Sequence, residues 1–298
     1  MKIAVYAAAS AAVLVALAAA QPASAQDAEI RHAVARVIVI PEDRADIGVE
    51  ITQGSANLPQ LRVERRGSKV MIDGGLGRRR NLNPFSDSGI RNCNNGPADA
   101  RQPGDGATIE VRSVGRIRLE DAPLIVLRTP RDVDVNAGDG VFGSVGRGAR
   151  SVELGAGGCG GWTVANVDGR LEINVGGSGS VRAGTSRSLE ANVGGSGSII
   201  AGATGALDAG IGGSGDIVVA RADGAVDIAI GGSGSVRVRG GSATSLEVAI
   251  GGSGDVRFDG TAASLDASIA GSGDVRVREV TGPVSRAIVG SGEVLIGR

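Results

Sequence analysis

The sequence has few of the residues on which most enzyme sites depend. Its 298 residues include one histidine, His32, two cysteines, one tryptophan, one tyrosine and three phenylalanines. One histidine excludes a multi-histidine metal site and leaves a cysteine nucleophile no base other than His32. The 31 basic and 32 acidic residues almost balance, so nothing marks a surface for nucleic acid or an anionic membrane. We expect no cofactor, no metal site, no nucleic-acid partner and no catalytic activity.

Glycine, in contrast, is abundant, with 51 residues, and 42% of the chain is hydrophobic. From residue 151 onward a Gly-Ser-Gly motif recurs every 18 to 20 residues, and Gly157-Gly-Cys-Gly-Gly161 is one further step back. This period defines eight rungs of about 19 residues. The central serines are Ser178, Ser196, Ser214, Ser233, Ser253, Ser272 and Ser291.

The rungs stack apolar residues in columns. Seven positions before each serine stands Leu or Val, three before and three after it stands Val or Ile, and the column five after it is mostly apolar. Apolar positions two apart, with polar residues between them, have the period of a strand. Strands repeated at this spacing predict an all-β fold, a parallel β-helix, in which the glycines permit positive φ and close backbone approach at each corner.

An acidic column lies on the outer face of the predicted rungs, six positions before each serine. It admits two interpretations, a stripe that binds cations or a basic partner, and a solvated face that keeps the sheet soluble. Arg182, Arg237, Arg257 and Arg276 recur four positions after the serine and could offset the repulsion, although surface ion pairs usually contribute only about 0–1 kcal/mol. Tight calcium binding is not expected, because the motif carries Asp at only three rungs. The acidic residues are Glu172, Glu190, Asp208, Asp227, Glu247 and Asp266.

The first 25 residues are typical of a secretory signal, with Lys2, an apolar run and Ala23-Ser24-Ala25 before the cleavage point. The alternative is a membrane-anchoring helix. Signal cleavage leaves no transmembrane segment, and the chain is expected in the periplasm, at the cell surface or outside the cell. In such an oxidising compartment Cys93 and Cys159 either form a disulfide or remain two small thiols.

Three segments follow from these patterns: the signal at 1–25, an irregular β-rich region of early rungs or a cap at 26–130, and regular rungs at 131–298. Within the second segment, residues 77–106 are polar and are expected to form a long loop. Its triplet Arg78-Arg79-Arg80 either binds an anionic polymer or is a solvated basic loop. In the last rung Arg286 occupies an otherwise apolar column, which indicates protection of the open edge or a docking surface.

The signal, the strand pair Val37-Ile-Val-Ile40 and Ile47-Gly-Val-Glu-Ile51, and the serial Gly-Ser-Gly rungs resemble the GIN-domain family, whose members are described as autotransporter adhesin heads of unknown function. The resemblance covers most of residues 33–298. It implies an exported right-handed β-helix without established catalytic residues.

We therefore predict a non-catalytic scaffold that binds a protein or polysaccharide at the cell envelope. Two alternatives stay open. One is a β-helix carbohydrate-active enzyme, a hydrolase or lyase, that uses acids of adjacent rungs such as Asp208 and Asp227. The other is a structural protein that assembles end to end through its terminal rungs.

Overall fold

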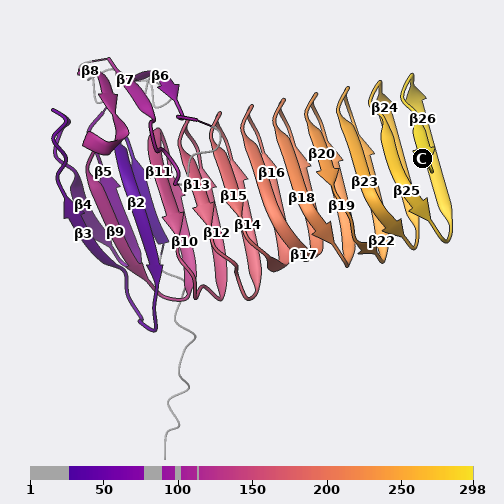
Figure 1. Cartoon of the computed structure of the whole chain (residues 1–298), viewed down its shortest axis with the longest axis horizontal. Helices are drawn as coiled ribbons and strands as arrows, with labels where there is room; N and C mark the ends of the chain where they lie inside the picture. Colours follow the sequence, from indigo (N-terminus) through magenta and orange to yellow (C-terminus); the bar gives the residue numbers. More distant parts are fainter. Residues whose placement is uncertain (1–26, 77–88, 98–101, 113, 298) are drawn as a thin grey trace, which may run out of the picture.

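The computed structural model describes residues 27–76, 89–97, 102–112 and 114–297. Strands follow one another throughout this part, and they wind into a β-solenoid of about nine regular turns (Figure 1). The predicted all-β fold and the 19-residue rung are confirmed. No helix among these residues has the length and hydropathy needed to cross a membrane. The predicted signal and the arginine triplet at 78–80 lie outside the described residues.

Each regular turn contributes a strand to each of two parallel ladders that flank the Gly-Ser-Gly corner. We call the ladder before the corner ladder A and the ladder after it ladder B. In spatial order ladder A contains β5 (Lys69–Asp73), β1 (Asp27–Arg31), β10 (Asp132–Ala137), β12 (Ser151–Ala156), β14 (Arg170–Val175), β16 (Ser186–Val193), the end of β17 (Ser198–Ile211), β19 (Ala225–Ile230), β22 (Ser245–Ile250), β24 (Leu265–Gly271) and β26 (Val284–Gly290).

Ladder B runs beside it in the same order of turns. It contains β9 (Leu124–Thr129), β2 (Val34–Pro41), β11 (Gly140–Val145), β13 (Gly161–Val164), β15 (Ser180–Ala183), the start of β17, β18 (Asp216–Ala222), β20 (Ser235–Val238), β23 (Asp255–Ala262), β25 (Val275–Val280) and β27 (Val294–Ile296). The short β21 (Ser242–Ala243) pairs with the end of β23 on the third side of the turn.

The core is the stack of inward columns, as the sequence predicts. Leu171, Leu189 and Leu207 face one another in adjacent strands and are buried. Trp162 and Phe258 also point inward and are buried. The register of the first regular rung is fixed by the pairing of Val133 with Val152, a step of 19 residues. One continuous apolar core therefore runs along the rod.

The regular corners need glycine because backbones approach closely, and positive φ is not the reason. A Cβ atom on Gly195 would collide with the carbonyl oxygen of Gly177 in the preceding turn, and one on Gly197 would collide with that of Gly179. Neither glycine has positive φ, unlike Gly271 and Gly290 at the last two corners. The expectation of positive φ is therefore wrong for most corners, where turn-to-turn spacing excludes a side chain.

The first two strands do not occupy the end of the rod. β1 pairs on one side with β5 and on the other with β10, and β2 pairs with β9 and β11. The rung formed by β1 and β2 is thus inserted between two rungs that come later in the chain. No periodicity in the sequence predicts this order, because the pairing is between distant segments.

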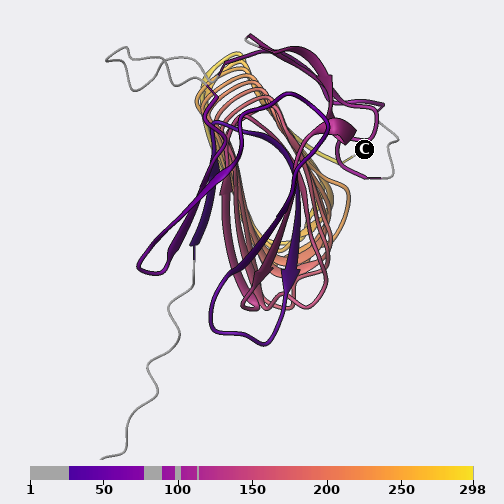
Figure 2. The ribbon, with the colours of Figure 1, turned by 90° about the vertical axis from the view of Figure 1, so that its left-hand side faces the viewer.

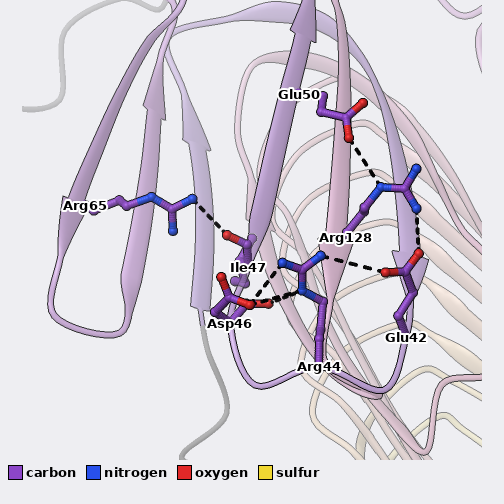
Figure 3. Close-up of polar contacts among 7 residues, drawn as sticks. All are labelled: Glu42, Arg44, Asp46, Ile47, Glu50, Arg65 and Arg128. Carbon is purple, nitrogen blue, oxygen red and sulfur yellow. Dashed lines mark hydrogen bonds and ion pairs between the residues drawn. The ribbon is translucent and has the colours of Figure 1, made fainter.

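At the N-terminal end of the rod both ladders finish in an antiparallel strand. β3 (Gly48–Thr52) and β4 (Arg62–Arg66) pair antiparallel with β9 and β5, the outermost strands of the two ladders. Between β2 and β3 the chain turns so that Ile47 is fully buried at the end of the core. Arg65 Nη2 donates a 2.9 Å hydrogen bond to the Ile47 carbonyl (Figure 3).

Ion pairs fix the turn that carries Ile47. Arg128 on β9 contacts Glu42 at 2.5 Å and Glu50 at 3.3 Å, and Arg44 bonds Asp46 at 3.0 Å (Figure 3). These residues come from the turn and from two neighbouring strands. Together they hold the cap across the end of the apolar core.

A second, smaller sheet stands beside the rod, visible at the edge of the end-on view in Figure 2. It consists of β6 (Ile90–Asn94), β7 (Thr108–Val111) and β8 (Gly115–Arg118), followed by the 3-10 turn η1 (Leu119–Asp121). We call it the side sheet. It covers Phe142 and Val34 on the outer face of ladder B with its own small core. The expectation that 77–106 is a loop is wrong for β6. Its sequence is polar, but it forms a strand that pairs with the more apolar β7.

The C-terminal end is open. No strand covers β26 and β27 among the described residues, and the side chains that continue the core columns, Val284, Ile288 and Ile296, are 38–41% exposed. Arg286 is also exposed in this last rung.

Candidate functional site

The acidic column lies on the outer face of ladder A, with one carboxylate in each turn. Glu172, Glu190, Asp208 and Asp227 stand opposite one another in successive strands, and Glu247 and Asp266 continue the row. Parallel strands are about 4.8 Å apart, so the row is straight and dense. The structure thus brings all six predicted residues together on one surface.

Three further acids extend this row toward the N-terminus. Glu153 faces Glu172, Asp134 faces Glu153, and Asp27 faces Asp134. Glu153 lies six positions before Cys159, so the repeat itself could have revealed it. Asp27 could not be found, because its strand is inserted out of order. We call the nine residues from Asp27 to Asp266 the acidic ladder.

The N-terminal half of the acidic ladder is partly neutralised. Lys69, opposite Asp27 across the β1–β5 pairing, bonds Asp27 at 3.0 Å and Glu29 at 2.9 Å. These two carboxylates raise the pKa of Lys69. Arg170 bridges Glu172 at 2.8 Å and Glu190 at 2.6 Å. Asparagines add donors, since Nδ2 of Asn136 reaches Asp134 at 3.1 Å and Nδ2 of Asn174 reaches Glu172 at 3.0 Å.

The C-terminal half is bare. Asp208, Asp227, Glu247 and Asp266 are exposed, and within the described chain no cation or hydrogen-bond donor reaches their carboxylates. Partial desolvation by the surrounding strands, with the nearby charges of Asp227 and Glu190, raises the pKa of Asp208. Like charges at strand spacing are therefore left unbalanced over four turns.

Asp134 lies in the N-terminal half of the acidic ladder, and its pKa is raised. Burial raises it to about 6, and Asp27 and Glu153 on the adjacent strands add to the effect, while Lys69 opposes it. A carboxyl with this pKa is partly protonated in mildly acidic solution. The neighbouring carboxylates thus raise the pKa of Asp134 even though Lys69 is close enough to oppose them.

The recurring arginines do not neutralise the acidic ladder. They stand on the outer face of ladder B, where Arg237 and Arg257 bond Asp259 and Arg276 bonds Asp274 at 2.8 Å. The expectation that they offset the repulsion is wrong, because the Gly-Ser-Gly corner places positions before and after it on different sheets.

The acids that follow the motif hold successive turns together. Asp255 accepts the Asp274 N–H at 2.9 Å, and Asp274 accepts the Glu293 N–H at 3.1 Å. Asp216 accepts both the N–H and the hydroxyl of Ser235. These carboxylates are occupied by the protein's own donors. No group of three or more His, Cys, Asp or Glu side chains placed to hold a metal occurs in the described part of the chain.

The two cysteines meet between the side sheet and the rod. Cys93 on β6 and Cys159 at the corner before β13 form a disulfide in the structure, with 6.2 Å between their Cα atoms. The bond joins the side sheet to the second regular turn.

The chain is similar to a family model over its last turns and to a solved structure over most of its length. Residues 211–297 match the family model described as "Putative auto-transporter adhesin, head GIN domain", so the predicted resemblance is confirmed for these rungs. This match is shorter than the 33–298 over which the resemblance was expected. No curated protein matches the chain. A crystal structure from Parabacteroides distasonis ATCC 8503, described as a "Putative lipid binding protein", is similar at 19% identity and a TM-score of 0.49, covering 92% of this chain and 94% of that one.

Proposed function

We propose that the chain is an exported, non-catalytic binding scaffold of the cell envelope, and that the bare half of the acidic ladder binds a basic segment of a partner protein. The observation that carries this proposal is the exposed, uncompensated row Asp208, Asp227, Glu247 and Asp266. Three of these four residues lie within 211–297, the part that matches an adhesin-head family. A binding role for these turns is consistent with that description.

Repulsion among the carboxylates of this row is the physical reason to expect binding of a basic segment. Each carboxylate lies about one strand spacing from the next, and the raised pKa of Asp208 reflects partial desolvation and these neighbours. A chain of lysines or arginines laid along the rod relieves the repulsion and releases counterions. Binding should therefore weaken steeply as salt is added.

A carbohydrate-active enzyme is the competing proposal. Asp208 and Asp227 are in register on adjacent strands, a separation close to that of the two carboxyl groups in retaining glycosidases. Sugar sites commonly offer an aromatic platform, but the aromatic residues in the described ranges, Phe142, Trp162 and Phe258, are all buried. A screen for degradation of common polysaccharides separates the two proposals. If the chain degrades a polysaccharide and Asp208→Asn abolishes this activity, the proposal of a non-catalytic scaffold is overturned.

Binding is tested with the mature chain and poly-L-lysine, followed by light scattering or calorimetry at several salt concentrations. The variant D208N/D227N/E247Q/D266N should bind at least tenfold more weakly and with a smaller salt dependence. A control with two neutralised acids elsewhere, D43N/E279Q, should bind nearly as the parent does. Equal binding by parent and quadruple variant would overturn the role of the row, and a preference for an amino-bearing polysaccharide such as chitosan would replace the protein partner.

Location is tested by protease treatment of intact cells and detection of the chain in surface, periplasmic and medium fractions. Cleavage on intact cells supports contact with partners outside the cell. If the chain is protected from the protease and is recovered in the periplasmic fraction, its partner is expected in the periplasm. Recovery of the chain in the cytoplasm alone would overturn the export proposal.

A further inference from the structure

A cleft separates the side sheet from the outer face of ladder B. Its floor is formed by the outward side chains of β2 and β9 and by β11, and its wall is the turn 102–108 with residues 118–120. The cleft has a volume of about 460 Å³. Sites for small molecules typically span about 300–1,000 Å³. Figure 2 shows the side sheet beside the rod.

Part of the cleft floor is apolar. Ile38 is 40% exposed there and Leu124 is half-buried beside it, while Leu119 and Phe142 lie behind this surface in the buried core of the side sheet. Elsewhere the outer face of ladder B carries serine, aspartate and arginine, together with two other exposed large apolar side chains, Ile200 and Leu295. Ile38 differs from these two because it lies beside an arginine within a cleft.

One cation in the cleft lacks an ionic partner. Arg36 on β2 donates from Nη2 to the Ala122 carbonyl at 3.2 Å, and no salt bridge to it occurs among the described residues. Its side chain is half-buried and lines the cleft. A guanidinium also matches the geometry of a carboxylate, sulfonate or phosphate group. The arrangement thus offers an anion site at the edge of an apolar floor.

The other charges of the cleft are already engaged. Arg118 contacts Glu120 at 2.8 Å and Asp121 at 2.9 Å, and the Asp105 carboxylate accepts the Gln102 N–H at 3.1 Å. Asp121 lies close enough for Arg36 to contribute to lowering its pKa, but hydrogen bonds from Ser55 and Arg118 are the larger causes. Arg36 is therefore the group with capacity left for an outside anion.

We propose that this cleft binds a small anionic amphiphile, with its acidic group on the Arg36 guanidinium and its apolar part over Ile38 and Leu124. This inference is independent of the proposed function, because the cleft and the acidic ladder lie on different sheets. The shared chemistry of the ligand is one negative group attached to a short apolar chain or ring. A free fatty acid and a lipid fragment both have it.

The test uses the mature chain, with n-decanoate in calorimetry and n-decanol as the neutral probe of equal length. We expect one decanoate site per chain, and binding at least tenfold weaker in Arg36→Gln, which keeps most of the side chain. Arg237→Gln, which removes an arginine from the same outer face away from the cleft, should leave the affinity unchanged. Decanol should bind more weakly than decanoate and should not respond to Arg36→Gln.

Ile38→Ser tests the apolar part of the site. Ile38 lies on the surface, so this variant should fold, which circular dichroism would verify. It should bind both decanoate and decanol more weakly than the parent chain does. Absence of decanoate binding at millimolar concentration would overturn the proposal. Equal affinity of the parent chain and Arg36→Gln would also overturn it, since the ligand would then be elsewhere. Added phosphatidylglycerol vesicles that compete with decanoate would identify a lipid as the source, and no competition would favour a free acid.

Discussion

At the scale of single residues, the acidic ladder shows how a repeat concentrates one chemical group. A carboxylate that is harmless on one strand becomes part of a dense row when it recurs in every turn. Asp134 lies at the most crowded point, where burial and the charges of Asp27 and Glu153 act together. The unfavourable free energy of ionising Asp134 therefore depends on the carboxylates of the neighbouring turns as well as on Asp134 itself.

This cost predicts a pH dependence. An unfolded aspartate titrates near 3.9 and Asp134 in the fold at about 6, so between these values the folded chain binds more protons. Its contribution to stability falls as pH rises from about 4 to 6 and is constant above. Asp134→Asn should raise the free energy of unfolding at pH 7.5 by about 1 kcal/mol, because solvent screens part of the interaction, and should leave it nearly unchanged at pH 4.

The measurement is urea denaturation of both proteins at pH 4, 5, 6 and 7.5. Asp43→Asn serves as a control, since its carboxylate is 82% exposed on a turn. A difference between the parent and Asp134→Asn that does not grow with pH would contradict the prediction.

At the scale of elements, the corner glycines set the distance between turns. Gly195→Ala places a Cβ against the carbonyl oxygen of Gly177, and backbone has to move to accommodate it. We expect a loss of about 1–3 kcal/mol. Gly212→Ala, at the first position of the next corner, meets nothing within 4 Å and should change stability by no more than about 0.5 kcal/mol. Chemical denaturation of both variants measures the contrast, and equal midpoints would show that the corner can relax.

The same elements show how far sequence reasoning reaches. The inward columns, the corners and the acidic row from Glu172 to Asp266 follow from the 19-residue period, because in a stacked repeat sequence alignment is spatial register. The inserted rung of β1 and β2 does not follow from this period, since Ala28 pairs with Val70 and Val135, which lie far away in the sequence. The sequence does not predict the Arg36 cleft for the same reason. Its walls come from segments with no repeat, and part of them lies in a stretch whose composition indicates a loop.

At the scale of the whole molecule, the disulfide joins two parts with separate apolar cores. We expect Cys93→Ser/Cys159→Ser to destabilise the side sheet by about 2–4 kcal/mol and to leave the regular turns folded. Hydrogen exchange would show this as faster exchange in β6, β7 and β8 with unchanged protection in β16 to β24. The parent chain in reducing agent should behave in the same way. Simultaneous loss of protection in both parts would contradict the prediction.

The different ends of the rod bear on self-association. Antiparallel strands β3 and β4 end the rod on one side and parallel strands β26 and β27 on the other. Val63 at the first end is exposed to the same degree as Val284 and Ile288 at the second. Open-ended filaments require each copy to offer two complementary ends. End-to-end assembly stays a prediction.

The inserted rung also decides how the molecule bears mechanical load. Force applied at Asp27 pulls β1 lengthwise between β5 and β10, so both rows of hydrogen bonds resist in shear at once. Force applied at Gly297 instead lifts β27 from β25 alone, and the turns can then peel off one after another. A rod held by its first strand is a firm anchor, while the same rod held by its last strand unwinds.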